Sequence, residues 1–433
     1  MNERDVDDGL LMHAWATDLF PICRSLTGEG VRTTLAYLGN LLPGLHVHSA
    51  ATGTKAFDWV VPEEWIIRSG YVADMDGNVL IDFKDSNLHI VGYSIAVDLV
   101  VSREVLFDHL YSLPEQPDAI PYITSYYSRT WGFCCTDNQR QLLLDSQYRV
   151  FIDSELTNGS LNYGELFIPG KSEEEVFIST YVCHPSMANN ELSGPVVSTR
   201  LAQHVLSLSE RHYSYRFVFI PETIGSIVFL SRNLDHLKQN VFAGFNVSCV
   251  GDDRAYSFLP SRSGNTVSDQ IAKHVLRHID ASYAKYTWLD RGSDERQYCA
   301  PFVDLPIASI MRTKYGMYPE YHTSLDDLVN VVTPSGLQGG YNALRKSLEI
   351  LERNFFPKVA VYCEPQLGKR GLYPNVSTKT SGATVKLMMD TISRCDGTCS
   401  VLDIADALEQ PFDVIFDIVD KLRDHSLVRD GDC

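Results

Sequence analysis

The fold is decided by residues 174–222, where EEVFISTYVCHP (174–185) is followed by GPVVSTRLAQHVLSL (194–208) and then by YRFVFIPE (215–222). The first and third segments are short apolar runs that predict buried strands, and the segment between them has the apolar spacing of a helix. Strands that alternate with helices predict a largely parallel sheet covered by helices. In such a sheet ligands collect at the carboxyl ends of the strands, so polar residues that follow an apolar run are the first candidates for a site.

Changes in sequence texture predict three domains. Residues 1–50 and 132–360 are expected to form an α/β domain whose mixed sheet is covered by helices. Residues 51–131 contain short aromatic and β-branched runs broken by Gly and Pro, which predict an inserted β-rich domain. Residues 375–433 contain three helical stretches with a turn between the last two, a pattern typical of a winged helix.

Composition and charge exclude several classes of function. The chain has 433 residues and a formal net charge of -18, which disfavours binding to phosphate backbones or anionic lipid. It has no apolar run of the roughly 20 residues that cross a bilayer, and its N-terminal segment is polar and acidic. The ten cysteines lack the paired spacing of a disulfide scaffold. We therefore expect a cytoplasmic protein with reduced thiols and no membrane partner.

The predicted winged helix does not have the charge of a DNA-binding domain. Residues 381–433 carry eleven Asp or Glu against five Lys or Arg. Contact with a DNA backbone requires the opposite balance. We therefore expect no nucleic-acid partner, and assign the tail to packing or homo-oligomerisation.

Three strand-end motifs carry candidate catalytic chemistry. His184 leaves the apolar run VFISTYV, and the Asn190 side chain, six residues later, could return across the loop to the same metal ion. Glu222 ends the run FVFIP, where a partly dry carboxylate is suited to deprotonate a metal-bound water. His322 begins the segment HTSLDD and could face the same site.

Each motif alone also has a structural explanation. A strand-end His is commonly a satisfied core residue, and Glu222 could simply cap the following helix. In HTSLDD, Ser324 or Asp326 could cap a helix start. The three motifs become informative through their order along the chain.

That order resembles a known family. The chain contains, in this order, a His, A-N-x-x-x-S-G, a Glu followed by Gly-Ser, G-S-D and His-Thr-Ser-x-Asp. This order is similar to that of the co-catalytic zinc aminopeptidases. The closest resemblance is to an aminopeptidase-like subgroup with a β-rich insertion and a C-terminal winged helix, through PICRSLTGEGVR, CHPSMANNELSG, PETIGS and HTSLDD. The resemblance covers nearly the whole chain. It implies an α/β fold with a phosphorylase/hydrolase-like mixed sheet, and a metal-dependent hydrolase of peptide or aminoacyl amide bonds.

The resemblance also implies roles for individual residues. His184 and His322 correspond to metal ligands, Glu222 to the general base, and Asn190 to the carboxylate that bridges two metals in the family. The G-S-D segment lines the substrate pocket in the family, so Asp294 or Glu295 could bind a substrate ammonium group and Arg296 a carboxylate. A solvated loop would explain that segment equally well.

The departures from the family pattern concern the metal. Asn190 is neutral, Thr223 stands where members have a second Glu ligand, and Ser248 lies near the position of another Asp ligand. Two zinc ions held close together need a bridging anion to offset their repulsion. We therefore expect a single zinc ion. The acids that could replace the missing ligands are Glu191, Asp252 and Asp253, and Ser186 replaces the Asp that supports the first His.

Two alternatives remain beside the hydrolase of a small peptide or aminoacyl substrate. The missing acids favour a catalytically silent binding protein on a peptidase scaffold. A cysteine hydrolase that uses Cys183 and His184 is disfavoured, because neighbouring residues on a strand point to opposite faces.

Overall fold

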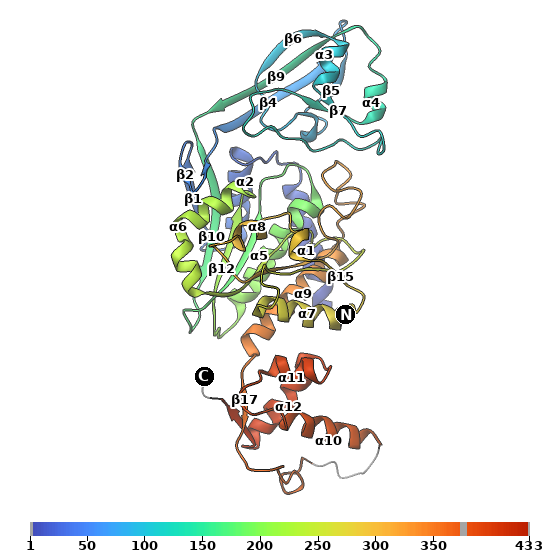
Figure 1. The fold of residues 1–433 in the computed structure, drawn as a ribbon. Helices are drawn as coiled ribbons and strands as arrows, with labels where there is room; N and C mark the ends of the chain where they lie inside the picture. The colour runs from blue at the N-terminus through green and yellow to red at the C-terminus, as the bar shows by residue number, and fades with distance from the viewer. Residues whose placement is uncertain (1–2, 373–378, 432–433) are drawn as a thin grey trace. The chain divides into compact units, whose positions relative to one another are not determined.

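The computed structural model describes residues 3–372 and 379–431 and is built around a mixed eight-stranded sheet (Figure 1). The strand order is β1-β10-β12-β11-β13-β16-β14-β15. The strands are β1 His46–Ala51, β10 Ser160–Ile168, β11 Glu175–Tyr181, β12 Ser214–Ile220, β13 Val241–Asn246, β14 Ser257–Leu259, β15 Ala284–Lys285 and β16 Ile307–Met311. The middle of the sheet, β12-β11-β13-β16, is parallel, whereas β1, β10 and β14 pair antiparallel. The predicted α/β fold class is confirmed.

The central strand β11 shows why this sequence folds as it does. All seven of its residues are buried, as expected for a parallel strand covered on both faces. The helices of the unit that contains this sheet are α1 Glu3–Leu19, α2 Glu29–Leu41, α5 Ser193–Ser207, α6 Ile224–Asn240, α8 Glu295–Tyr298 and the first parts of α7 Val267–Ile279 and α9 Pro334–Arg353. Helix α5 packs on β11 and α1 packs on α5, so the strand that leads to His184 lies in the interior.

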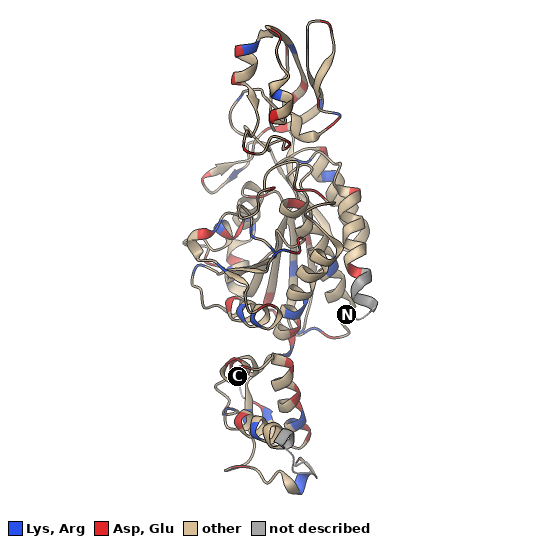
Figure 2. Cartoon of the chain, turned by 90° about the vertical axis from the view of Figure 1, so that its right-hand side faces the viewer, with Lys and Arg blue, Asp and Glu red and all other residues tan. Residues whose placement is uncertain are grey.

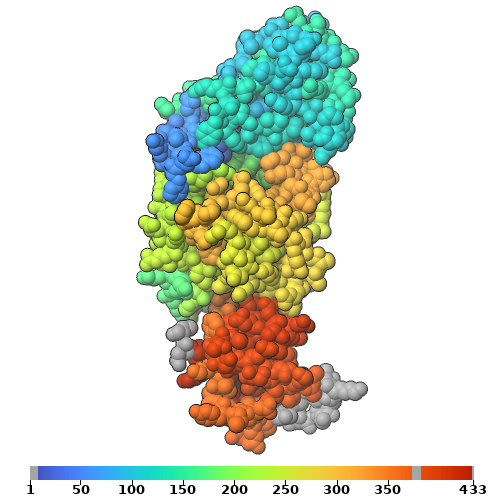
Figure 3. All heavy atoms as spheres, in the orientation of Figure 1, coloured from blue at the N-terminus to red at the C-terminus, as the bar shows by residue number. Residues whose placement is uncertain are grey.

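The inserted β-rich region forms its own antiparallel sheet, in the order β5-β4-β9-β6. These strands are β4 Glu64–Ala73, β5 Val79–Asp82, β6 Val97–Ser102 and β9 Gln147–Thr157. The remaining elements of the insertion are short: β2 Lys55–Ala56, β3 Trp59–Val60, η1 Asn87–His89, α3 Arg103–Asp108, β7 Leu110–Tyr111, β8 Phe133–Cys134 and α4 Asp137–Gln141. Figure 3 shows the cyan and teal atoms of this region in one continuous patch.

The predicted boundary of the insertion at residue 131 is wrong. Strand β9 pairs with β4 on one side and β6 on the other, so a segment after residue 131 supplies a central strand of the inserted sheet. Local texture could not reveal this, because the pairing joins residues 64–73 to residues 147–157.

The C-terminal part is a separate compact unit made of Lys273–Ala281 and Lys346–Cys433. It contains α10 Lys379–Ile392, α11 Val401–Ala407, α12 Phe412–Asp424, η4 Gly368–Arg370 and the end of α9 Pro334–Arg353, together with the strand pair β17 Pro357–Val359 and β18 Val428–Asp430. Three helices and a small antiparallel pair confirm the predicted winged helix. The boundary at residue 375 is wrong, since β17 lies before it and completes the sheet with the last strand.

None of the helices within residues 3–372 and 379–431 is both long enough and apolar enough to cross a membrane.

Candidate active site

His184 and Glu222 meet because they follow neighbouring parallel strands. Tyr181 and Ile220 are paired at the ends of β11 and β12, and the Val182 N–H still donates to the Ile220 carbonyl. Carboxyl ends of parallel strands share one edge of a sheet. The two side chains therefore converge, with His184 Nε2 lying 3.7 Å from Glu222 Oε2.

His322 reaches the same place from the loop after β16. Its ring centre lies 5.7 Å from that of His184, which is close enough for both imidazoles to contact one ion. The backbone of His322 has a φ of 56°, a left-handed conformation that is uncommon for a non-glycine residue. The structure therefore brings together His184, Glu222 and His322, and their roles remain a prediction.

The inserted region contributes directly to this site through Tyr122. Its ring packs edge-on against both imidazoles, with centres 5.2 Å from His184 and 5.3 Å from His322. The Tyr122 N–H donates to the His322 carbonyl at 2.8 Å, and the Tyr122 hydroxyl bonds to that of Tyr126 at 2.9 Å. The sequence did not indicate this contact, because Tyr122 belongs to no recognisable motif.

The two imidazoles have opposite electrostatic surroundings. Burial and the neighbouring His184 lower the pKa of His322 to about 3, so its ring is neutral and can offer a lone pair. Burial alone would also lower the pKa of His184, but Cys183 and Glu191 beside it outweigh that effect and raise the pKa well above its usual value.

Asp294 is a fully buried acid close to the partly exposed Glu222. Burial raises the pKa of Glu222, although His184 and Arg296 oppose the shift. Burial and the nearby Glu222 raise the pKa of Asp294 to about 8. A carboxylate with raised proton affinity is suited to accept a proton from water near neutral pH.

The three predicted substrate contacts lie in different environments. Asp294 is fully buried and accepts bonds from the Thr223 N–H at 2.7 Å and from Ser226 Oγ at 2.8 Å. Glu295 is also fully buried, and its carboxylate accepts bonds from Gly292 N, Ser293 N, Tyr315 Oη and Asn246 Nδ2. Both acids thus anchor the local backbone, which does not support a direct contact with substrate.

Arg296 is the member of this segment that is not fully buried. Its Nη2 donates to Thr223 Oγ1 at 3.1 Å, and its Nε donates to the Ser293 carbonyl. Arg296 therefore remains the best-placed of the three to contact a substrate.

Asn190 is held by Tyr181 and Asp326. Its Oδ1 accepts a bond from the Tyr181 hydroxyl at 3.0 Å, and its N–H donates to Asp326 Oδ2. Asp326 was predicted to cap a helix start, but in the structure it has another role. Its carboxylate accepts the N–H groups of both Asn189 and Asn190 and so holds the loop that carries them.

Glu191 is the acid that reaches His184 instead. It is 1% exposed, and its Oε2 lies 2.8 Å from His184 Nδ1. The turn Ala188–Leu192 is π-helical, which holds more residues per turn than an α-helix. Side-chain directions are therefore shifted from those that sequence spacing suggests, and no sequence signal marks the shift.

The other two candidate acids make hydrogen bonds of their own. Asp252 is 1% exposed and bonds to Asn189 Nδ2 and to Thr313. Asp253 is exposed and bonds to Ser335. Asp253 is thus an acid at the surface, and Asp252 is a buried acid that also accepts the Arg254 N–H.

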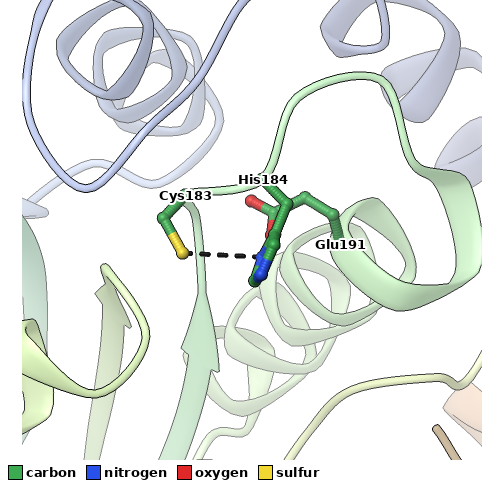
Figure 4. Close-up of side chains that lie close together, drawn as sticks. All are labelled: Cys183, His184 and Glu191. Atoms are coloured by element: carbon green, nitrogen blue, oxygen red, sulfur yellow. Dashed lines mark hydrogen bonds and ion pairs between the residues drawn. The ribbon is translucent and has the colours of Figure 1, made fainter. Parts of the chain in front are cut away.

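Cys183, His184 and Glu191 form a tight cluster on the Nδ1 side of the imidazole (Figure 4). One ligand atom from each lies within 4.8 Å of the others, and Cys183 Sγ is 3.5 Å from Nδ1. The expectation that Cys183 and His184 point apart is wrong, because β11 ends at Tyr181 and the strand alternation stops there. Burial nevertheless raises the pKa of the Cys183 thiol to about 11, which disfavours a nucleophilic thiolate.

His184 therefore offers two faces to a metal ion. The Nδ1 face carries Cys183 and Glu191, but the Arg24 guanidinium lies 3.5 Å from Glu191 and repels a second cation there. Glu222 lies on the Nε2 side, and the neutral imidazole of His322 lies 5.7 Å from that of His184, centre to centre. Imidazoles are ligands that zinc accepts, so His184 and His322 fit a single ion with the Glu222 carboxylate beside it.

A pocket of about 240 Å³ adjoins the Nε2 face. His184, Glu222 and Thr223 line it on one side, and the inserted region lines it with Trp59, Tyr126 and Tyr127, alongside Leu26, Cys183 and Ile224. A largely apolar pocket with a few convergent polar groups is the usual form of a small-molecule site.

Comparison with known sequences identifies two matching families. Residues 13–354 match the model described as a domain of unknown function (DUF4910), and residues 355–430 match a winged helix-turn-helix model. A Clostridium acetobutylicum protein described as a "putative polysaccharide biosynthesis protein with aminopeptidase-like domain" is 43% identical over 390 residues. The match covers 90% of this chain and 89% of that protein.

Comparison with solved structures agrees with the sequence matches. A structure described as a "putative peptidase" from Clostridium acetobutylicum superposes with a TM-score of 0.93 at 39% identity, over 99% of this chain and 98% of that one. A zinc aminopeptidase from Bacillus subtilis superposes with a TM-score of 0.59 at 11% identity, over 79% of this chain and 95% of that one. At 11% identity, the second likeness concerns the fold alone.

Proposed function

Since the chain belongs to the DUF4910 family and carries an aminopeptidase-like domain, we propose that it is a metal-dependent hydrolase of peptide or aminoacyl amide bonds. The observation that carries the proposal is the convergence of two imidazoles, with ring centres 5.7 Å apart, and a carboxylate 3.7 Å from one of them. His184 and Glu222 follow the ends of neighbouring strands and border one pocket, and His322 comes from the loop after β16.

A single zinc ion would be held by His184 and His322, with Glu222 beside it. When bound, zinc supplies a positive charge that polarises the scissile carbonyl and acidifies a water molecule. A second ion is disfavoured, because Asn190 is neutral and its Oδ1 is bonded to Tyr181.

Glu222 acts as the proton carrier in this proposal. Its carboxylate accepts a proton from the attacking water and later delivers it to the leaving amine. Burial, which raises its pKa, helps Glu222 to hold that proton near neutral pH. His322 remains neutral and does not compete for the proton.

The substrate is a small peptide or aminoacyl amide with a free terminus. Trp59, Tyr126 and Tyr127 give the pocket apolar surface for a side chain, and Arg296 can pair with a carboxylate. No nucleic acid or membrane surface is expected as a partner.

The test begins with metal content and turnover. Purified protein is assayed for bound zinc and for cleavage of aminoacyl-nitroanilides, with Glu222→Gln as the catalytic variant and exposed Glu210→Gln as its control. We expect metal-stimulated cleavage that Glu222→Gln lowers by about 100-fold to 10,000-fold. Protein that binds no metal and cleaves no substrate after zinc is added would refute the hydrolase.

The second candidate is a catalytically silent binding protein. The observation in its favour is that Asp294 and Glu295, in the segment that lines the substrate pocket of related peptidases, are occupied by internal hydrogen bonds. Thermal shift measurements with amino acids, peptides and sugar-linked amines would distinguish the two. Stabilisation without product in the presence of zinc supports the binding protein, whereas product formation rules it out.

A further inference from the structure

Arg24, from the segment PICRSLTGEGVR, has no part in the mechanism above, yet it is only 1% exposed. Its Nε donates to the His184 carbonyl at 2.9 Å, and its Nη1 donates to the Leu19 carbonyl at 2.8 Å. A buried guanidinium is costly unless it has a charge partner. Its position against the backbone of His184 therefore calls for an explanation beyond packing.

The charge partner of Arg24 is Glu191. Arg24 Nε lies 3.5 Å from Glu191 Oε1, and both side chains are fully buried. The second carboxylate oxygen, Oε2, lies 2.8 Å from His184 Nδ1. His184 is thus held at two points by one ion pair, at its main-chain carbonyl by Arg24 and at its ring by Glu191.

Ser186 stands where the family has the Asp that supports the first His, and it does not support His184 here. Among the described residues, Ser186 Oγ donates to the Phe20 carbonyl and accepts a bond from Asn87, and it forms no hydrogen bond with the imidazole. The ring of a metal-binding histidine is normally oriented by an acceptor at its other nitrogen. Glu191 is the acceptor at that nitrogen here.

We propose that Arg24 and Glu191 are positioning residues for His184, and that neither is a metal ligand. Glu191 fixes the imidazole so that Nε2 points toward Glu222, and Arg24 supplies the counter-charge that a buried carboxylate requires. This inference rests on the proposed function in one respect, namely that Nε2 is the atom that works in the site.

A contribution to fold stability does not by itself explain why the Arg24–Glu191 ion pair is present. Replacing a buried ion pair by apolar residues is commonly neutral or stabilising, whereas removing one partner is strongly destabilising. We therefore expect Arg24→Met/Glu191→Leu to be at least as stable as either single variant, as measured by thermal unfolding. The double variant then reports on positioning without the penalty of an unpaired charge.

The first experiment examines the ring and requires neither metal nor turnover. In metal-free protein labelled with ¹⁵N-histidine, the His184 Nδ1 proton should give a downfield, slowly exchanging signal, assigned through its absence in His184→Gln. Glu191→Ala should remove this signal, and Glu191→Gln should retain it because the amide oxygen can still accept the bond. A folded Glu191→Ala or double variant that keeps the signal overturns the proposal.

The second experiment measures kcat and KM. Glu191→Ala and the double variant should lower kcat by about 10-fold to 100-fold with a smaller change in KM, and Glu191→Gln should recover part of the loss. The control is Glu175→Gln, which breaks a buried pair with Arg216 at the opposite end of β11 and should lower the melting temperature without lowering kcat.

The outcomes separate the two proposals. An active wild type whose folded Glu191→Ala variant keeps full kcat overturns the positioning role and leaves the hydrolase standing. A wild type with no activity but with the Nδ1 signal lost only in the Glu191→Ala and double variants overturns the hydrolase and supports the positioning role.

Discussion

His184 is the residue on which the site depends, because its two ring nitrogens have different neighbours. Nδ1 lies 2.8 Å from Glu191, and Nε2 lies 3.7 Å from Glu222. A metal ion can therefore choose between a face with Cys183 and a face with His322. Substitution of those two residues distinguishes the faces.

We expect His322→Ala to weaken zinc binding and Cys183→Ser to preserve it. The reason is that the Nδ1 face already contains the Arg24 guanidinium, which repels a second cation. Isothermal titration of metal-free protein with zinc measures both affinities, and we expect a loss of at least about 10-fold to 100-fold for His322→Ala alone. The reverse pattern would place the metal at Cys183, His184 and Glu191.

Asp294 makes stability depend on pH. Its folded pKa is raised from 3.8 to about 8, so the protonated acid favours the folded state. This contribution is complete below about pH 4 and is lost as the pH rises through 8. Asp294→Asn should therefore be more stable than the wild type at pH 9, by about 2 kcal/mol, and should lose this advantage near pH 5.

Urea unfolding at a series of pH values measures that difference. The matched control is Asp76→Asn, an exposed acid of the inserted region, whose effect should not change across the range. An Asp294→Asn variant that follows the wild-type pH profile would contradict the assignment of this acid.

At the scale of elements, the connection from β11 to α5 determines which side chains face the site. The π-helical turn Ala188–Leu192 directs Glu191 toward His184, and Asp326 holds that turn by accepting two of its N–H groups. The turn passes directly into α5, whose first residues are all buried. Close packing at this junction is therefore a condition for the site.

Gly194, in the first turn of α5, tests this packing. A Cβ at Gly194 would lie 2.3 Å from Thr180 Oγ1 and 2.5 Å from the Val247 carbonyl oxygen. We expect Gly194→Ala to lower the free energy of unfolding by about 1–3 kcal/mol, because the backbone of Val247 must move. Urea unfolding measures the loss, and hydrolysis should fall with it.

The control is Gly39→Ala in α2, where an added Cβ meets no atom within 4 Å. That variant should gain about 0.5–1 kcal/mol, since Ala loses less conformational entropy in a helix than Gly does. Equal effects at the two glycines would show that packing around α5 is unimportant.

At the scale of the whole molecule, the candidate site combines residues from the main sheet and from the inserted region. The sheet brings His184, Glu222 and His322 together, and the inserted region adds Tyr122, whose ring contacts both imidazoles. The C-terminal unit has the topology of a winged helix, with repeated Asp on α11 and α12. In Figure 2 the acidic residues of the chain are red. A shared fold does not imply a shared function, so that unit is judged by its charge.

We expect the full-length protein not to bind double-stranded DNA at physiological salt. Residues 381–433 carry eleven acidic against five basic residues, which opposes the counterion release that drives nonspecific binding. Fluorescence anisotropy with a labelled duplex at about 0.05 M and 0.2 M salt measures this. Binding that weakens steeply with salt would contradict the expectation and assign the winged helix to nucleic acid.

The sequence by itself determined the fold class, and it predicted His184 and Glu222 as site residues, whose roles stay predictions. Apolar runs that end in His184 and Glu222 are local signals, and parallel strands bring their carboxyl ends together wherever such runs alternate with helices. The winged helix was equally accessible, because its helices follow a local apolar spacing.

Only the tertiary structure decided which neighbours complete the site. Glu191 rather than Asn190 faces the imidazole because a π-helical turn shifts side-chain directions, and Arg24 and Tyr122 arrive from segments distant in the chain. The strand β9 likewise belongs to the inserted sheet because it pairs with β4, a strand distant in the chain. Sequence periodicity describes which face of an element is apolar, whereas long-range packing selects the partner that covers it.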